Sequence, residues 1–283
     1  MEEKVIRKFL DWIEEDMPFR DETTELLLPA GTVIRAHVIA KKEGIIACVS
    51  EVVLFLKHIG LRVNVLKNDG EKVTPNDVVM EIIGDARKIL AVERTILNLL
   101  GHCSGIATIT RKLVEKAKKV NPRIRIAATR KTLPGLRYFE KKAVIIGGGD
   151  PHRYSLSDMI LIKDNHLKIV GSVREAIKRA RRASFTKKIE VEVESIDEML
   201  EAVEAGADII MLDNFKPSDV GKAVEELKKR GMRDRVVIEV SGGITPENID
   251  EYLKHDIDVI SLGWITHSAP SLDLSLEVVE VIR

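Results

Sequence analysis

Residues 188 to 213, KIEVEVESIDEMLEAVEAGADIIMLD, carry the clearest structural pattern in the chain. The run Lys188 to Val193 is rich in β-branched residues, as is Asp208 to Leu212, and short runs of this kind are typical of buried strands. Between them, Ser195 stands three residues before a glutamate, the spacing of a helix capping box, and Gly206 marks the end of that helix. The stretch therefore predicts a strand, a helix and a second strand in one parallel sheet.

The same alternation repeats from about residue 108 onward. Ser172 has the same capping-box spacing, and Thr245 precedes Pro246, which suits the first position of a helix. Six or seven such units predict a closed or nearly closed α/β barrel with fewer than eight strands, and an open doubly wound sheet is the alternative. The remaining predicted strands are Ile124 to Ala128, Ala143 to Ile146, Met159 to Ile162, Val236 to Val240 and Val259 to Leu262.

The first hundred residues have a different, mixed α+β pattern. An amphipathic helix is predicted over Lys4 to Glu15, and a second one after Gly84, running through Leu90 to Leu100. The change of pattern divides the chain into a first domain, residues 1–107, and a barrel domain, residues 108–270. The predicted strands of the first domain are Thr32 to Ala40, Leu61 to Lys67 and Val78 to Ile83, with a turn at Asn68, Asp69 and Gly70.

Composition excludes several classes of protein. The 283 residues are 45% hydrophobic and 32% charged, which suits a globular protein and excludes collagen, low-complexity disorder and a disulfide scaffold. The 45 basic and 45 acidic residues cancel, so bulk charge predicts binding neither to nucleic acid nor to a membrane surface. Cys48 and Cys103 have no metal-binding or redox spacing, which predicts two buried thiols in a reducing cytoplasm.

Sorting signals and membrane spans are not predicted either. The start of the chain lacks a basic segment followed by an apolar one, and no apolar run reaches the roughly eighteen residues that a bilayer requires. The expected location is the cytoplasm.

Polar or glycine residues follow most of the predicted barrel strands. In an α/β barrel the carboxyl ends of the strands meet at one opening, where the active site lies. Such residues at five or more strand ends predict a ring of donors, cations and carboxylates around that opening. They are residues 129–132, 163–166, Glu192 with Glu194, Asp213 with Asn214, residues 241–243 and Gly263.

Cations dominate this ring: Arg130, Lys131, Lys163, His152 and Arg153. In a chain of zero net charge, such a cluster predicts a local site for a carboxylate or phosphate ligand. The alternative is that these side chains pair with acidic residues on neighbouring helices. The three glycines before Asp150 are interpreted as a flexible loop that presents the histidine and the second arginine.

A phosphate site is predicted beside the cations. Ser241, Gly242 and Gly243 lie between a strand and a predicted helix start, where backbone N–H groups bind phosphate, and Gly263 follows the next strand. The opposite charge comes from two carboxylates at adjacent strand ends, and this spacing is consistent with Mg²⁺. The same pair could serve as a general acid and base, or form ion pairs with Lys163 and Arg130. These carboxylates are Glu192 and Asp213.

Several common catalytic motifs are absent from the sequence. It has no phosphate-binding P-loop, no nucleophile elbow and no paired cysteine and histidine, so no covalent nucleophile is predicted. The run of three glycines lacks the spacing of a dinucleotide fingerprint, which argues against a nicotinamide cofactor.

Three segments resemble the quinolinate phosphoribosyltransferase family, and further motifs extend the resemblance along the whole chain in family order. The three segments are ATRKTLPGLR (residues 128–137), GGGDPHR (147–153) and LIKDNH (161–166). The others are ERTILN (93–98), SGIAT (104–108), EVEV (190–193), MLDN (211–214), SGG (241–243) and LGWITHS (262–268).

The resemblance implies a fold and a reaction. It implies an N-terminal α/β sandwich domain, rejoined by the last segment, 271–283, and an open α/β barrel. It also implies a homodimer in which the first domain of one subunit closes the barrel of the other. The implied reaction joins quinolinate to phosphoribosyl pyrophosphate with Mg²⁺ and gives nicotinate mononucleotide, pyrophosphate and CO₂ in NAD biosynthesis.

The resemblance also assigns roles to residues. The carboxylates of quinolinate would be bound by Arg130, Lys131, His152, Arg153 and Lys163, with Arg94 from the partner subunit. The 5′-phosphate site would comprise Ser241, Gly242, Gly243, Gly263 and His267. Glu192 and Asp213 would hold Mg²⁺ on the pyrophosphate side, while Lys131 and Lys163 are expected to stabilise the carbanion that decarboxylation leaves.

Three rival functions remain open at this point. Nicotinate phosphoribosyltransferase needs only one carboxylate clamp and does not decarboxylate, so the surplus cations argue against it. A similar pyrophosphorylase-like protein linked with molybdenum uptake is disfavoured by the intact cationic motifs. A catalytically silent barrel that senses a phosphorylated metabolite would have no need of the carboxylate pair.

Overall fold

The chain folds into two compact units. The computed structural model describes residues 1–282. The first unit comprises Met1–Ile109, Ile145–Gly147 and the residues from Ala269 onward, and the second comprises Thr110–Val144 and Gly148–Ser268. Within the described residues, no helix combines the length and the apolar character that a membrane span requires.

The first unit is built on a four-stranded antiparallel sheet in the order β12-β1-β5-β3. Every second residue of β1 is buried, so one face of the sheet is turned to the core. The terminal strand β12 pairs along the whole of β1, with Ala40 opposite Leu274. The strands are β1 (Val33–Ala40), β3 (Arg62–Val65), β5 (Val78–Asp85) and β12 (Leu274–Ile282), and β2 (Gly44–Ile45) pairs with β4 (Lys72–Val73).

Helices complete the core of the first unit. Phe9 of α1 stacks on Phe55 of α3 with ring centroids 4.6 Å apart, and both side chains are fully buried. The two predicted helices and the three predicted strands are present, whereas α2 and α3 were not predicted. The helices are α1 (Glu2–Asp16), α2 (Glu22–Leu27), α3 (Val49–His58) and the 35-residue α4 (Ala86–Val120), which continues into the second unit.

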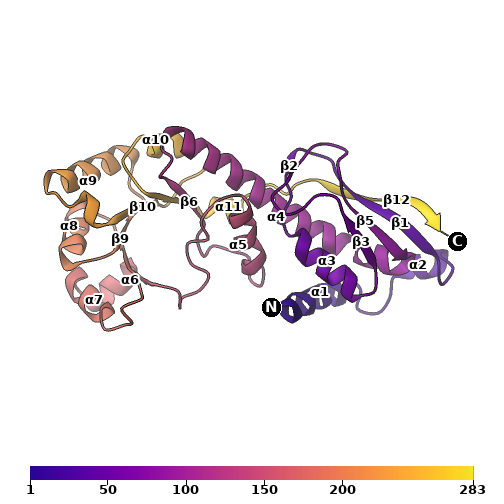
Figure 1. Ribbon diagram of the computed structural model, residues 1–283. Helices are drawn as coiled ribbons and strands as arrows, with labels where there is room; N and C mark the ends of the chain where they lie inside the picture. The colour runs from indigo at the N-terminus through magenta and orange to yellow at the C-terminus, as the bar shows by residue number, and fades with distance from the viewer. Residues whose placement is uncertain (283) are drawn as a thin grey trace. The chain divides into compact units, whose positions relative to one another are not determined.

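The second unit, which holds the strands labelled β6, β9 and β10 in Figure 1, contains a parallel six-stranded sheet in the order β6-β11-β10-β9-β8-β7. Its first two strands in chain order, β6 and β7, are the two edges, so the barrel is open between them. The predicted α/β barrel with fewer than eight strands is confirmed. The strands are β6 (Arg125–Ala127), β7 (Ile160–Ile162), β8 (Ile189–Val193), β9 (Ile209–Asp213), β10 (Val237–Ser241) and β11 (Val259–Ser261).

Helices follow the barrel strands. Ser172 and Ser195 accept the backbone N–H of the residue three positions on, as their capping-box spacing predicts, and Gly206 ends α8 in the left-handed conformation. The helices are α5 (Arg137–Ile146), α6 (Asp164–Val170), α7 (Val173–Ala180), α8 (Ile196–Ala205), α9 (Pro217–Lys229), α10 (Ile249–Leu253) and α11 (Trp264–His267), with a 3₁₀ turn at Arg233–Arg235.

Two predicted elements are wrong. Ala143 to Ile146 is the last turn of α5 rather than a strand, because Phe139, Ala143 and Val144 share one buried helical face. A single bridge from Asp150 to β6 is formed a few residues later instead. The helix predicted at Pro246 begins only at α10, because the side chain of Asn248 accepts the N–H of Thr245 and closes a turn there.

Candidate active site

A cavity of about 600 Å³ opens at the carboxyl ends of the barrel strands. Four strands each contribute a residue at the end and the residue two positions deeper, because alternate side chains of a strand face the barrel interior. These pairs are Leu161 with Lys163, Met211 with Asp213, Glu239 with Ser241, and Ser261 with Gly263. Twelve predicted site residues line the cavity: Arg130, Lys131, His152, Arg153, Lys163, Glu192, Asp213, Ser241, Gly242, Gly243, Gly263 and His267.

One predicted site residue does not line this cavity. Arg94 lies on α4 in the first unit, where its side chain is 65% exposed and reaches within 4.0 Å of Glu93. Its predicted role in a partner subunit stays a prediction.

The cationic wall of the cavity is partly buried. Arg153 is only 5% exposed, and its pKa is lowered first by burial and then by the charge of Arg130. The Nε atom of Arg130 is buried without a hydrogen-bond partner among residues 1–282. Because buried guanidinium groups are stabilised by anions, these two side chains suit a carboxylate or phosphate ligand.

The loop before Arg153 is held firmly, so its interpretation as flexible is wrong. The backbone N–H of Gly149 donates to Val144, and that of Asp150 donates to Ile126. A Cβ on Gly149 would lie 2.7 Å from Cγ2 of Thr110, so the chain is closely packed here. The loop follows a helix rather than a strand, and packing of its glycines fixes the residues after it.

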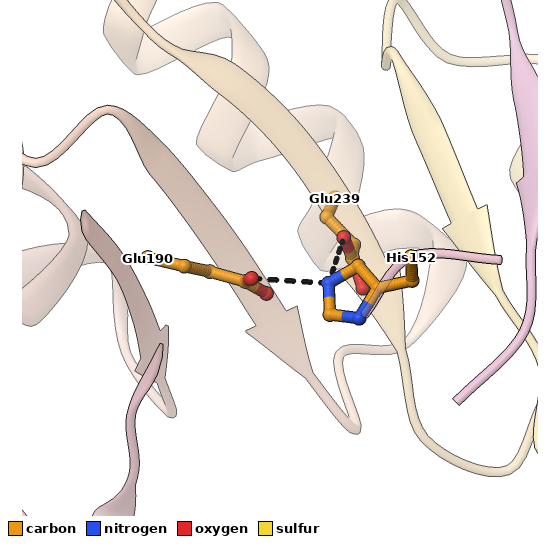
Figure 2. Close-up of side chains that lie close together, drawn as sticks. All are labelled: His152, Glu190 and Glu239. Atoms are coloured by element: carbon orange, nitrogen blue, oxygen red, sulfur yellow. Dashed lines mark hydrogen bonds and ion pairs between the residues drawn. The ribbon is translucent and has the colours of Figure 1, made fainter. Parts of the chain in front are cut away.

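His152 reaches from this loop to two buried glutamates (Figure 2). Its Nε2 atom lies 3.1 Å from Oε2 of Glu190 and 3.6 Å from Oε2 of Glu239. Burial works to lower the pKa of His152, but the hydrogen bond to Glu190 and the charges of both glutamates outweigh it and raise the pKa overall. Burial, followed by the charge of Glu190, raises the pKa of Glu239 to about 7.

Neither glutamate had been assigned a role from the sequence. Glu190 belongs to the EVEV segment, residues 190–193, and Glu239 belongs to none of the segments that carry the resemblance. A signal was present, because both residues are spaced two positions before a predicted site residue, Glu192 and Ser241, and so face the same interior.

The acidic side of the cavity lies at the ends of β8 and β9. The ammonium group of Lys163 contacts Oε2 of Glu192, as one of the predicted ion pairs requires. Burial raises the pKa of Asp213, and the charge of Glu192 raises it further. The two carboxylates are thus close enough to interact, and Mg²⁺ typically binds one or two carboxylates together with water and phosphate oxygens. The pair fits such an ion.

The glycines leave room for a ligand at the remaining strand ends. Gly242 has a φ of 92°, and a Cβ there would lie 2.3 Å from Oδ1 of Asn214. A Cβ on Gly263 would lie 2.9 Å from Cδ of Lys131 and 3.2 Å from Nε2 of His267, so any side chain would crowd the cavity. Because α10 begins further on, a phosphate here would rest on the glycine loop rather than on that helix.

Comparisons with known proteins agree along the whole chain. Residues 21–104 match the quinolinate phosphoribosyl transferase N-terminal domain, and residues 106–277 match its C-terminal domain. A probable nicotinate-nucleotide pyrophosphorylase (carboxylating) of Archaeoglobus fulgidus is 52% identical over 93% of this chain and all of the relative. One from Methanothermobacter thermautotrophicus is 49% identical over 95% and 96% of the two chains.

A solved structure has the same fold. The nicotinate-nucleotide pyrophosphorylase from Francisella tularensis has a TM-score of 0.90 and 36% identity, and the match covers 98% of this chain and 97% of that one. The chain belongs to the quinolinate phosphoribosyltransferase family.

Proposed function

We propose that this protein transfers the phosphoribosyl group of phosphoribosyl pyrophosphate to quinolinate and decarboxylates the product to nicotinate mononucleotide. The observation that carries this proposal is a single cavity that combines five cationic side chains, three carboxylates and two glycine turns. A dicarboxylate needs more cations than nicotinate does, and the glycine turns suit a phosphate. Family membership and the names of the relatives support the same reaction.

The first step requires positioning rather than a covalent enzyme intermediate. Arg130, Lys131, His152, Arg153 and Lys163 bind the two carboxylates and direct the pyridine nitrogen at C1 of the ribose. The nitrogen forms its bond to C1 as the bond to pyrophosphate breaks, through an oxocarbenium-like state. Fixed orientation and charge stabilisation are sufficient for such a displacement.

Glu192 and Asp213 would hold Mg²⁺ at the side where pyrophosphate leaves. When bound, the ion would neutralise charge that develops on the departing pyrophosphate. The ion pair of Glu192 with Lys163 keeps that carboxylate at the cavity wall.

Decarboxylation follows on the nucleotide. The bond between C2 and its carboxylate breaks, CO₂ leaves, and the electron pair stays on C2 until it takes up a proton. Because the ring nitrogen now carries a positive charge, the carbanion lies beside a cation, and Lys131 and Lys163 add further positive charge at the same wall.

A homodimer with shared active sites is part of this proposal. The exposed Arg94 would complete the dicarboxylate site of the partner subunit, and the domains would be residues 1–107 with 271–283 and residues 108–270. A cytoplasmic location is also proposed, which the buried thiols of Cys48 and Cys103 suit.

Substrate choice tests the proposed function. Purified protein with Mg²⁺ and phosphoribosyl pyrophosphate is incubated with quinolinate or with nicotinate, and nucleotides are separated by chromatography. We expect nicotinate mononucleotide from quinolinate and none from nicotinate. Product from nicotinate alone would support the non-decarboxylating rival, and binding of a phosphorylated metabolite without turnover and without Mg²⁺ would support the sensor.

A further inference from the structure

The proposed reaction does not use two glutamates of the barrel interior, of which Glu239 lines the cavity and Glu190 lies beneath its surface. Glu190 of β8 is fully buried, and Glu239 of β10 is 2% exposed. Strand β9 lies between these strands, so the side chains meet across the barrel interior. An interior layer of an α/β barrel is normally filled by branched apolar side chains. Two carboxylates there require a specific partner, because a buried charge is unfavourable unless it is paired.

His152 is that partner. Its Nε2 atom is the point where both carboxylates meet, 3.1 Å from Glu190 and 3.6 Å from Glu239. The other oxygen of each glutamate, Oε1, has no hydrogen-bond partner within residues 1–282. An ionised carboxylate accepts hydrogen bonds and does not donate them, so with Glu190 ionised the 3.1 Å contact is a hydrogen bond when Nε2 carries the proton.

The backbone holds the ring in place from the other side. His152 has a φ of 56°, in the left-handed region, and its N–H donates to Oδ1 of Asp150 at 2.7 Å. Asp150 in turn bridges to β6. Residues other than glycine adopt this backbone conformation when the surrounding structure imposes it, and such residues cluster at functional sites.

We propose that Glu190 and Glu239 are positioning residues, which keep the proton on Nε2 of His152 and fix its ring so that Nδ1, protonated in the cationic ring, donates to a substrate carboxylate. Figure 2 shows Nδ1 on the side of the ring away from Glu190. That His152 binds a dicarboxylate rests on the proposed function, whereas the state of its ring does not. This role explains why the barrel interior holds two glutamates beside His152 where apolar side chains would normally lie.

A histidine and two carboxylates could also hold a divalent cation, since their ligand atoms lie within 4.8 Å of one another. The surrounding charge favours a proton instead. Lys141 is buried behind the loop, with its ammonium group on the carbonyl of Pro151, and Arg153 lies next in the chain. The charged groups that act on the ring are Glu190, Glu239 and Lys141, while Asp150 accepts the backbone N–H of His152. Lys141 and Arg153 already place positive charge beside the ring, and this charge would repel a divalent cation.

Nuclear magnetic resonance of the ligand-free protein tests the ring directly. The imidazoles are labelled with ¹⁵N, and the His152 signals are identified by their loss in His152→Asn. In the native protein we expect Nε2 to stay protonated between about pH 6 and pH 9. In the double variant Glu190→Gln with Glu239→Gln, we expect the neutral ring to shift toward the tautomer that carries its proton on Nδ1. An Nε2 that loses its proton near the ordinary histidine pKa in the native protein would overturn the proposal. So would stoichiometric metal that is bound by the native protein and lost with the two glutamates.

Kinetics test the consequence. Glu190→Gln and Glu239→Gln, each alone, should raise the KM for quinolinate about tenfold while leaving the KM for phosphoribosyl pyrophosphate unchanged. Glu226→Gln, on the far α9 and paired with Arg230, is the control and should change neither. An equal rise in the KM values for both substrates would show general damage to the protein and contradict a positioning role. If quinolinate were not a substrate at all, the proposed function would fail while the resonance result stood.

Discussion

The guanidinium group of Arg153 is buried in the wall of the cavity, 5% exposed, with the carbonyl of Met159 3.5 Å from Nη1. Lysine keeps the charge but lacks the planar fork that binds a carboxylate through two parallel hydrogen bonds. We expect Arg153→Lys to lower kcat/KM for quinolinate by roughly ten- to a hundredfold, as steady-state kinetics will measure, because a charge-assisted bond contributes about 1.5–3 kcal/mol. Arg182→Lys, which is exposed on a distant loop, is the control. An unchanged kcat/KM for quinolinate would remove Arg153 from the site.

Lys141 links stability to pH. Burial lowers its pKa to about 8, and the charge of Arg137 adds to the effect. Between this value and the unfolded value of 10.5, the unfolded chain holds a proton that the folded chain has lost, so the folded state gains stability as pH rises. We expect the free energy of unfolding of the native protein, relative to Lys141→Met, to increase by about 2 kcal/mol from pH 7 to pH 10. Urea unfolding at both pH values measures it.

The exposed Lys222→Met provides the control for this experiment, because its side chain is 68% exposed and should show no such difference. If the free energies of unfolding of the native protein and Lys141→Met changed equally between the two pH values, the lowered pKa of Lys141 would be wrong.

The sequence predicts the site residues at the strand ends, but it does not predict the buried residues that contact them. Lys163 and Asp213 follow β-branched runs, so their position at the cavity mouth follows from chain order alone. Glu239 lies inside a strand, where a charged residue normally indicates a solvent-facing position. Its burial depends on His152, which arrives from a separate loop, and no local pattern reports such a contact.

Within a helix, the effect of replacing a glycine depends on how closely a neighbouring segment packs against it. A Cβ on Gly105, in the middle of α4, would lie 2.1 Å from the carbonyl oxygen of Pro270. Replacing glycine by alanine in a helix normally stabilises it by about 1 kcal/mol. Here we expect Gly105→Ala to lower the free energy of unfolding by about 2 kcal/mol or more, because backbone must move. Chemical denaturation measures the change.

Gly221 of α9 is the matched helical control. A Cβ there would meet only ring atoms of His255, at 3.1 and 3.3 Å, and that side chain can turn aside. Gly221→Ala should be neutral or stabilising by up to about 1 kcal/mol. If Gly105→Ala were equally harmless, the packing of residue 270 against α4 would be wrong.

Helices were predicted best where the capping residues and the hydrophobic periodicity indicated the same boundaries. The helices after Ser172 and Ser195 begin where their capping boxes indicate. The segment from Ala143 to Ile146 failed because β-branched residues favour strands locally, while burial of one helical face decided the outcome. Pro246 failed because the side chain of Asn248 stabilises a turn that propensity alone does not reveal.

At the scale of the whole molecule, the proposed dimer predicts complementation between inactive variants. Arg94→Ala lacks the arginine offered to the partner, and Lys163→Ala lacks a cation of its own cavity. When equal amounts are co-expressed, each mixed dimer has one intact site, so activity should return to about a quarter of the native value for random pairing. Kinetic assay of the purified mixture measures it.

Lys131→Ala mixed with Lys163→Ala is the matched control, because both residues line the same cavity of one subunit and no mixed dimer gains an intact site. A mixture of Arg94→Ala and Lys163→Ala no more active than its components would contradict shared active sites.

Release of labelled CO₂ tests the proposed reaction, because the cationic cavity is proposed to bind a dicarboxylate and to remove one of its carboxylates. Quinolinate labelled in the C2 carboxylate is incubated with the purified protein, Mg²⁺ and phosphoribosyl pyrophosphate, and CO₂ and nicotinate mononucleotide are measured together. We expect equal amounts of CO₂ and nicotinate mononucleotide from the native protein, and neither product from a Lys163→Ala protein. Nucleotide that retains the label, or no nucleotide at all, would contradict it.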